Sequence, residues 1–292
     1  MSEPFSTPAA QPPGAWRRLL RNRVAVVAMV LLSAVILLAV FGPLVFPYDP
    51  ETPTAAKLVD PSRAHFFGTD MNGRDLFSRV IQGARISLIV GLCGALVSFF
   101  IGTTYGLIAG YAGGRTDNVM MRFVEVLHSV PRLIIVIVAI FSFAPWLEKW
   151  LHGALPGIEG YAKIIILIVC LGLIEWLSMA RIVRGQVLAL KEQQFVIAAR
   201  ALGQSHTRIL LRHLLPNLIG VIVVYLTLTI PAVILDESFL SFLGLGINDP
   251  QASWGSLLSD GKNVINPIRS YWWLLLFPAA AMAHGRRSVR RT

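Results

Sequence analysis

The chain has 292 residues, of which 55% are hydrophobic and 14% are charged. Soluble domains carry roughly 25% charged residues, so this composition argues against a soluble monomer and places the chain in a lipid bilayer. A net charge of +10 would indicate nucleic-acid binding in a soluble protein. Here the long apolar runs leave little surface for a nucleic-acid groove, and basic residues fit the positive-inside bias of membrane proteins. No nucleic-acid partner is expected.

The N-terminal 15 residues are rich in Pro, Ser, Ala and Gln, which predicts a disordered tail at 1–15. Arginines follow, and then an apolar run from Val24 to Phe46. A cleaved signal peptide is the competing interpretation. The run is longer than a usual signal core, and Pro43 and Pro47 follow instead of a small-residue cleavage site. We therefore expect an uncleaved first membrane-spanning helix.

Further apolar runs approach the roughly 20 residues that a helix needs to cross the hydrocarbon layer. They are Ile86–Ala109, Val119–Phe143, Ala162–Met179 and Leu218–Leu235. A sixth run extends from Tyr271 to Ala283, and its about 13 residues would cover only about 20 Å as a helix. Pro131 and Pro231 are expected to kink their spans. The predicted fold is an all-α polytopic membrane helix bundle with about six transmembrane helices, the sixth truncated.

Lys and Arg in the connecting segments predict the orientation of the chain. The strongly basic segments, expected in the cytoplasm together with the short link Tyr111–Asn118, are 1–23, 181–213 and 284–292. The segments of mixed charge, expected on the outside, are 47–85, 144–161 and 241–270. An even number of spans with both ends inside is consistent with this assignment.

Glycines recur every four residues along the second expected span and just beyond it. They are Gly102, Gly106, Gly110 and Gly114. This spacing places them on one helix face, where a neighbouring helix can approach closely. The chain has 24 glycines, so chance is the alternative, but a packing face is favoured.

Ionisable residues interrupt several apolar runs, and intramembrane charge by default indicates function. They are Glu125, His128, Arg132, Glu175 and Asp236. Glu125 and Arg132 are interpreted as residues at helix ends or beside water. Glu175 and Asp236 are candidate residues of a transport pathway.

Nothing in the sequence indicates a metal site, a cofactor or a catalytic centre. Cys93 and Cys170 lie in apolar runs and are expected to be free hydrophobic residues, and the histidines lack metal-ligand spacing. The nearest approach to a phosphate-binding loop runs from Gly255 to Asn263, but its spacing is one residue too long and Asn replaces the hydroxyl residue. The chain is therefore not expected to hydrolyse ATP or to be an enzyme.

The stretch from Arg181 to Leu215 is too long for a simple hairpin and too polar to be inserted. A short helix is predicted over Gln193–Leu202, and Gly203 is a natural C-terminal stop. A second helix is predicted over His206–Leu215, with Pro216 marking the return to the membrane. Such a short apolar and basic helix suits docking into a groove of a partner, and it equally suits a helix that lies on lipid headgroups.

The amino-acid sequence from Phe195 to Pro216 follows a recognisable pattern. The matching residues are Phe195, Ile197, Ala198, Ala199, Arg200, Ala201, Leu202, Gly203, Leu215 and Pro216. The pattern resembles the EAA loop of ATP-binding-cassette (ABC) importer permeases, although Ile197 stands where the family usually has glutamate. The resemblance implies that these residues dock onto an ATPase subunit.

Two further blocks resemble the dipeptide and oligopeptide branch of that family. The first is Phe67–Asp70 with Gly73–Asp75, Ser78 and Arg79, and the second is Glu237–Gly246 with Pro250 and Ser253–Gly255. The resemblance extends over about 17–278. It implies a first span that precedes a five-helix transport core.

The resemblance implies a permease subunit of an ABC importer for dipeptides, oligopeptides or related solutes, located in the cell's inner membrane. Its implied partners are two ATP-binding subunits, a second homologous permease subunit and an extracytoplasmic solute-binding protein. The implied divisions are a cytoplasmic tail (1–23), a first helix with an external segment (24–80), a transport core (81–283) with its coupling loop (181–215), and a basic tail (284–292). The alternative is a secondary transporter driven by an ion gradient, but no inverted repeat is visible between the two halves.

The end of the chain departs from the family pattern. Where family members continue with a full apolar span and a short tail, this chain changes after Ala283 to a basic stretch, His284–Thr292. Either the last helix is truncated or the reading frame changed near Ala280.

Overall fold

The computed structural model describes residues 23–45, 49–155, 157, 159–266 and 269–289. These residues form helices and connecting loops. The described part of the chain also has one isolated β-bridge, between Thr69 and Asp75. The predicted all-α class is confirmed. The predicted disordered tail at 1–15 and the last basic residues, 290–292, lie outside the described residues.

Four helices of the described chain are long and apolar enough to cross a membrane. They are α3 (Leu76–Ala112), α5 (Arg132–Ala154), α6 (Ala162–Leu190) and the helix from His206 to Phe242. Two apolar stretches are shorter: Ser33–Gly42 within α2 (Arg23–Val45), and Trp273–Ala283 within α11 (Trp273–Val289). A polytopic membrane helix bundle is thus confirmed.

The predicted span over Val119–Phe143 is wrong. The structure divides this stretch into α4 (Gly114–Ser129) and α5, which begins at Arg132. Between them Val130 is extended, with φ −79° and ψ 132°. Pro131 explains the break, because a proline ring disfavours helical backbone at the preceding residue. Pro131 therefore separates two helices instead of kinking one, whereas Pro231 does lie inside the last long helix.

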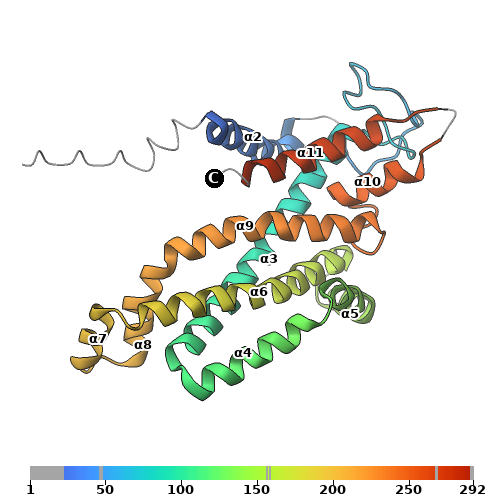
Figure 1. Cartoon of the computed structure of the whole chain (residues 1–292). Helices are drawn as coiled ribbons and strands as arrows, with labels where there is room; N and C mark the ends of the chain where they lie inside the picture. Colours follow the sequence, from blue (N-terminus) through green and yellow to red (C-terminus); the bar gives the residue numbers. More distant parts are fainter. Residues whose placement is uncertain (1–22, 46–48, 156, 158, 267–268, 290–292) are drawn as a thin grey trace, which may run out of the picture.

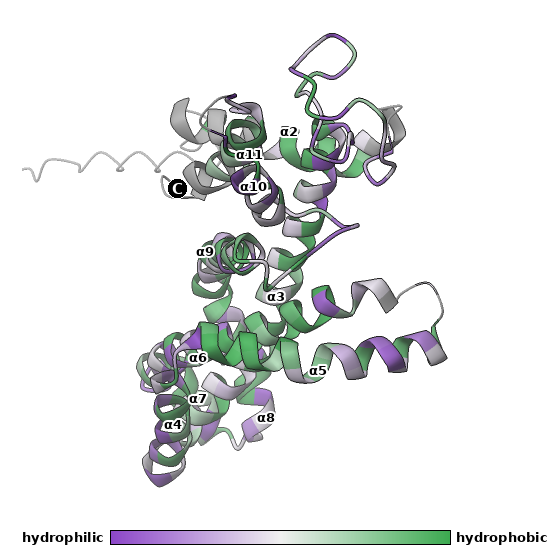
Figure 2. Ribbon diagram, turned by 90° about the vertical axis from the view of Figure 1, so that its right-hand side faces the viewer, coloured by the Kyte–Doolittle hydropathy of each residue, from purple (hydrophilic) through white to green (hydrophobic). Residues whose placement is uncertain are grey.

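The long helices pack around α3, which crosses behind α6 and the last long helix (Figure 1). The most extensive helix pair is α3 with α6. Val90, Leu167 and Val233 are fully buried where three of these helices meet. Figure 2 shows hydrophobic residues along the long helices, whereas hydrophilic residues gather in the loop around 49–75 and on α4.

One set of connecting segments meets at what we name the α10 end, made of residues 49–75, 159–161 and 243–266, which include α10 (Trp254–Asn263). Arg74 donates from Nη1 to Asp249 over 3.0 Å. A Cβ atom on Gly160 would lie 3.6 Å from the side-chain nitrogen of Gln251. These segments are the ones that the sequence predicts to share the outside.

The other set meets at the α7 end, made of residues 110–118 and 190–214. The hydroxyl of Tyr111 lies 2.8 Å from Nδ1 of His206. Lys191 donates from Nζ to the carbonyl of Gly110 over 3.2 Å. The charge pattern grouped these same segments together, and their position in the cytoplasm remains a prediction.

Candidate functional sites

The α7 end carries the predicted docking loop. The helix α7 (Gln194–Ala201) lies within the predicted range Gln193–Leu202. Gly203 follows with φ +73°, a left-handed conformation that glycine adopts without strain. Its amide donates to the carbonyl of Arg200 over 3.0 Å, so the glycine closes the helix as the sequence predicts.

α7 has a buried face and an exposed face. Val196 and Ala199 pack into a buried cluster with Ile209, Leu214 and Leu218. The exposed residues of the predicted docking set are Phe195, Ile197, Ala198, Arg200, Ala201, Leu202, Gly203 and Pro216, while Leu215 is half-buried. Within that set Ala199 therefore faces the protein itself and supports the loop from beneath.

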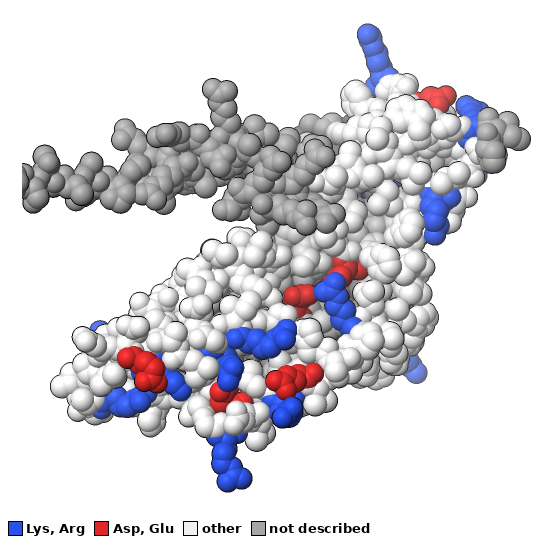
Figure 3. Space-filling model, in the orientation of Figure 1, with Lys and Arg blue, Asp and Glu red and all other residues white. Residues whose placement is uncertain are grey.

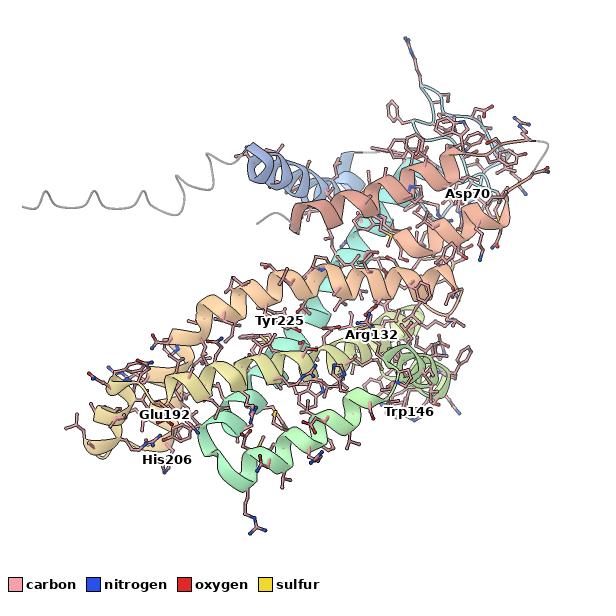
Figure 4. All side chains as sticks on the ribbon, viewed as in Figure 1. Asp70, Arg132, Trp146, Glu192, His206 and Tyr225 are labelled. Atoms are coloured by element: carbon pink, nitrogen blue, oxygen red, sulfur yellow. The ribbon has the colours of Figure 1, made fainter. Side chains whose placement is uncertain are left out.

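Polar contacts that the sequence did not reveal hold this loop in place. His206 contacts Tyr111, and the guanidinium of Arg200 lies 5.4 Å from the centre of the Tyr111 ring, a cation–π arrangement. Nε2 of His213 lies 2.8 Å from Oε1 of Gln204. Figure 4 labels His206 at this end of the molecule. The loop is therefore attached to the end of α3, a contact that no local sequence pattern could indicate.

The predicted separate helix over His206–Leu215 is wrong in its end point. A short α8 (His206–Arg208) passes through a π-helical segment, Ile209–Leu214, directly into α9 (Leu215–Phe242). The amide of Leu215 donates to the carbonyl of Leu210, the i−5 pattern of a π-helix. Pro216 lies where the backbone hydrogen bonds change from the π-helical to the α-helical pattern. Its missing N–H group therefore falls at this change of register.

A second site is a charged cluster between three long helices. Arg132, the first residue of α5, lies with Nη1 3.4 Å from Oε1 of Glu175 on α6. Its Nη2 lies 3.0 Å from Oδ1 of Asp236 on α9. The structure thus brings both predicted pathway residues to one guanidinium. Figure 3 shows a basic side chain between acidic ones in the hollow below α9, and Figure 4 labels Arg132 between the α9 and α6 ribbons.

The cluster borders a cavity of about 220 Å³. The cavity is lined by residues 127–132 and 135 and by Ile174, Glu175, Leu177 and Ser178. Arg132 is 53% exposed, whereas the Glu175 and Asp236 side chains are only 13% and 12% exposed. The interpretation of Arg132 as an ordinary helix-end residue therefore misses its role as the shared partner of two carboxylates. Glu125 lies inside α4, four residues before its end, where it is exposed and 3.4 Å from Arg122 on the same helix.

A third cluster, at the α10 end, was not identified from the sequence. Arg79 is fully buried, and its guanidinium reaches Asp70 at 3.0 Å, Asp249 at 3.1 Å and Asp260 at 3.3 Å. Arg74 donates from Nε to Asp70 over 2.8 Å (Figure 4, Asp70). Burial, and next the Asp249 carboxylate, raises the pKa of Asp260 to about 6 although Arg74 opposes the shift. The cluster ties the segment before α3 to the loop after α9.

The second family-like block also has a structural role. The carboxylate of Glu237 is fully buried and accepts hydrogen bonds from Ser241 over 2.8 Å and from Ser87 on α3 over 3.0 Å. The ring of Trp254 is buried and donates to the carbonyl of Val80 over 3.3 Å. The block therefore joins the end of α9 and the start of α10 to α3.

Three of the four regularly spaced glycines face α6. Cβ atoms on Gly102, Gly106 and Gly110 would lie 2.6 to 2.8 Å from side chains of α6. Gly114 differs, because it begins α4 with φ +55° and an added Cβ would have no atom within 4 Å. The predicted face therefore ends at Gly110, where α3 is about to end. In the described part of the chain no group of His, Cys, Asp and Glu is arranged to hold a metal ion.

These features define a class: a helical membrane protein with a fixed loop at one end and charges between its spans. Residues 102–285 match the family described as binding-protein-dependent transport system inner membrane component, and residues 14–61 match the N-terminal transmembrane domain of oligopeptide transport permease C. The chain belongs to this family of inner membrane transport components. Because the chain belongs to this family, the alternative interpretation as a transporter driven by an ion gradient is rejected.

The chain is similar to several permeases over most of its length. It is 44% identical to the dipeptide transport system permease protein DppC of Bacillus subtilis over 266 residues, which cover 91% of this chain and 77% of that protein. It is 43% identical to the oligopeptide transport system permease protein OppC of Haemophilus influenzae over 268 residues, covering 90% and 79%. It is 44% identical to OppC of Escherichia coli K12 over 266 residues, covering 90% and 82%.

Proposed function

We propose that this chain is a permease subunit of an ABC importer for dipeptides or oligopeptides in the inner membrane. The observation that carries the proposal is its 44% identity to dipeptide and oligopeptide permeases over about nine-tenths of its length. In this proposal a second permease completes the pathway, two ATPase subunits dock at the α7 end, and a solute-binding protein delivers peptide at the α10 end.

The exposed face of α7 supports the docking role. Ile197 is 52% exposed and Leu202 is 81% exposed, although both are large and apolar. The opposite face is buried, and the loop is attached to α3 through Tyr111, so a force applied to α7 reaches the bundle. An apolar surface on a fixed short helix is what a groove on a partner binds.

The charged cluster supports the pathway role of Glu175 and Asp236. A charged side chain in a spanning helix is costly in lipid and faces protein or water. Arg132 is half exposed within this one chain. In a membrane its face must therefore meet a water-filled path or another subunit, and a pathway between two permeases supplies both.

The docking proposal predicts that Leu202→Glu prevents co-purification of the ATPase subunits expressed with this chain. A buried carboxylate at the centre of an apolar contact lacks a partner and weakens binding. The matched control is Leu155→Glu, a leucine that is 50% exposed just after α5, at the opposite end of that helix from α4. Retention of the ATPase by the Leu202 variant, or its loss from both variants, would contradict docking at α7.

The transport proposal is tested in proteoliposomes that contain the complete complex. Uptake of a labelled dipeptide is expected to require ATP and the binding protein and to persist without an ion gradient. Uptake that follows an ion gradient and ignores ATP would contradict the proposal.

A further inference from the structure

The cluster of Arg132, Glu175 and Asp236 contains two carboxylates and one guanidinium. The guanidinium lies nearer to Asp236, at 3.0 Å, than to Glu175, at 3.4 Å. Charge-assisted N–H···O bonds are usually about 2.7–2.9 Å long, so the contact to Glu175 is a weak one. Within the cluster, Glu175 is therefore the carboxylate with the weaker contact to the guanidinium.

Glu175 faces the cavity of about 220 Å³, whereas Asp236 does not line it. His128, Ser129, Arg132 and Ser178 also line this cavity, and the hydroxyl of Ser129 donates to the carbonyl of Val126 over 2.7 Å. One water takes up about 30 Å³ of liquid, so the space holds a small polar end group and a few waters. Asp236 engages the Arg132 guanidinium at 3.0 Å, so Glu175 is the carboxylate of this lining that is left to accept from a primary ammonium, which has three hydrogen-bond donors.

We propose that the cavity beside Glu175 binds the N-terminal α-ammonium of a peptide in transit, with Glu175 as the carboxylate acceptor. The inference rests on the proposed function and adds a binding site on the permease itself. During binding Arg132 keeps its shorter contact to Asp236, and the ammonium takes the place of its longer contact to Glu175. The Arg132 guanidinium also lines the cavity, but a peptide C-terminal carboxylate would have to compete with Asp236 for it.

The test compares a free dipeptide with its N-acetylated form as substrates of the complete complex in proteoliposomes. For each complex the ratio of kcat/KM for the free peptide to that for the acetylated peptide is measured with the same binding protein. Dividing the wild-type ratio by the variant ratio cancels the selectivity of the binding protein. For Glu175→Gln this quotient is expected to be about tenfold, the effect of removing one charge-assisted hydrogen bond.

Three variants complete the experiment. Glu175→Asp keeps the charge and is expected to stay near the wild-type ratio. Glu125→Gln makes the same chemical change at an exposed carboxylate on α4 and is expected to leave the ratio unchanged. Arg132→Gln frees both carboxylates and is expected to raise the preference for the free amine, so it tests the site even if the Glu175→Gln complex does not assemble.

The possible failures are distinguishable. A quotient near one for Glu175→Gln, or an Arg132→Gln ratio at or below wild type, overturns the ammonium site while ATP-dependent uptake leaves the proposed function intact. A wild-type complex that imports neither peptide overturns the proposed function and the site with it.

Discussion

Arg79 is a guanidinium with no exposed surface, and three carboxylates surround it. Arg79→Met is expected to destabilise the protein by about 3–5 kcal/mol, because removing one partner of a buried ionic network leaves the others uncompensated. Chemical unfolding in detergent measures the loss. The control is Arg269→Met, whose exposed partner Asp60 lies 3.6 Å away, and its effect is expected to stay below about 1 kcal/mol. Equal effects of the two variants would show that burial of Arg79 has no energetic weight.

Asp260 makes the α10 end sensitive to pH. Its pKa in the folded protein, about 6, is above the ordinary value of 3.8, so the folded state holds this proton more tightly than the unfolded state. The stabilisation is complete below the ordinary pKa and is lost as the pH rises through about 6. Hydrogen exchange of residues 49–75, corrected for its intrinsic rate, is expected to become faster between pH 5 and 7.

Asp260→Asn removes the titrating group and is expected to flatten this pH profile. The control is Asp60→Asn, which neutralises an exposed carboxylate within residues 49–75 and is expected to keep the wild-type profile. If Asp260→Asn retains the full pH dependence, another group is responsible.

At the scale of the helices, the contact between α3 and α6 depends on the absence of side chains. A Cβ on Gly106 would lie 2.8 Å from Cβ of Val183 and 3.0 Å from the amide nitrogen of Arg184. Gly106→Ala is therefore expected to destabilise the protein by about 1–3 kcal/mol, the usual effect of overpacking a well-packed interior. Thermal unfolding in detergent measures the change.

Gly185 is the matched control for that substitution. It lies on α6, and an added Cβ there would have no atom within 4 Å. Gly185→Ala is expected to stabilise the protein by up to about 1 kcal/mol, because alanine favours helix and restricts the unfolded chain. A destabilising Gly185→Ala would mean that helix propensity does not govern this position.

Hydropathy predicted most helices, because a spanning helix needs a long apolar run. It missed the start of α3, ten residues before Ile86, because Asp75 caps the helix by accepting from the amide of Ser78 and the polar first turns are buried in ion pairs. It also joined α4 to α5 across Pro131. In both places a local backbone preference or a distant partner outweighs the average polarity of the segment.

The sites show the same division between local and distant causes. Glu175 and Asp236 were identified because charge in a spanning helix is costly, and Gly203 because helices often end at glycine. The pairing of Arg132 with both carboxylates depends on how three helices cross, and the Arg79 cluster joins residues about 170 positions apart. No periodicity within one segment encodes such contacts.

For the whole molecule, the charge bias of the loops grouped segments that the fold does bring together. In the described part of the chain, the basic stretch 190–213 meets the link 111–118 at the α7 end, and the mixed segments meet at the α10 end, as the contacts of Tyr111 and of Arg74 illustrate. The sequence could predict this grouping because two loops share a side of the membrane when an even number of spans separates them, and the spans are readable as apolar runs.

The continuous helix from His206 to Phe242 has 37 residues. Its length of about 55 Å exceeds the roughly 30 Å hydrocarbon layer, and even at a tilt of about 40° it would extend about 42 Å across the membrane. Its first nine residues, with Arg208, Arg212 and His213 among them, are about 13 Å long, which matches this excess, and basic residues of this kind favour a position outside the hydrocarbon layer. A partner that binds the loop before His206 acts on the first part of a helix whose far part carries Asp236, so a tilt of this helix would move that carboxylate relative to Arg132.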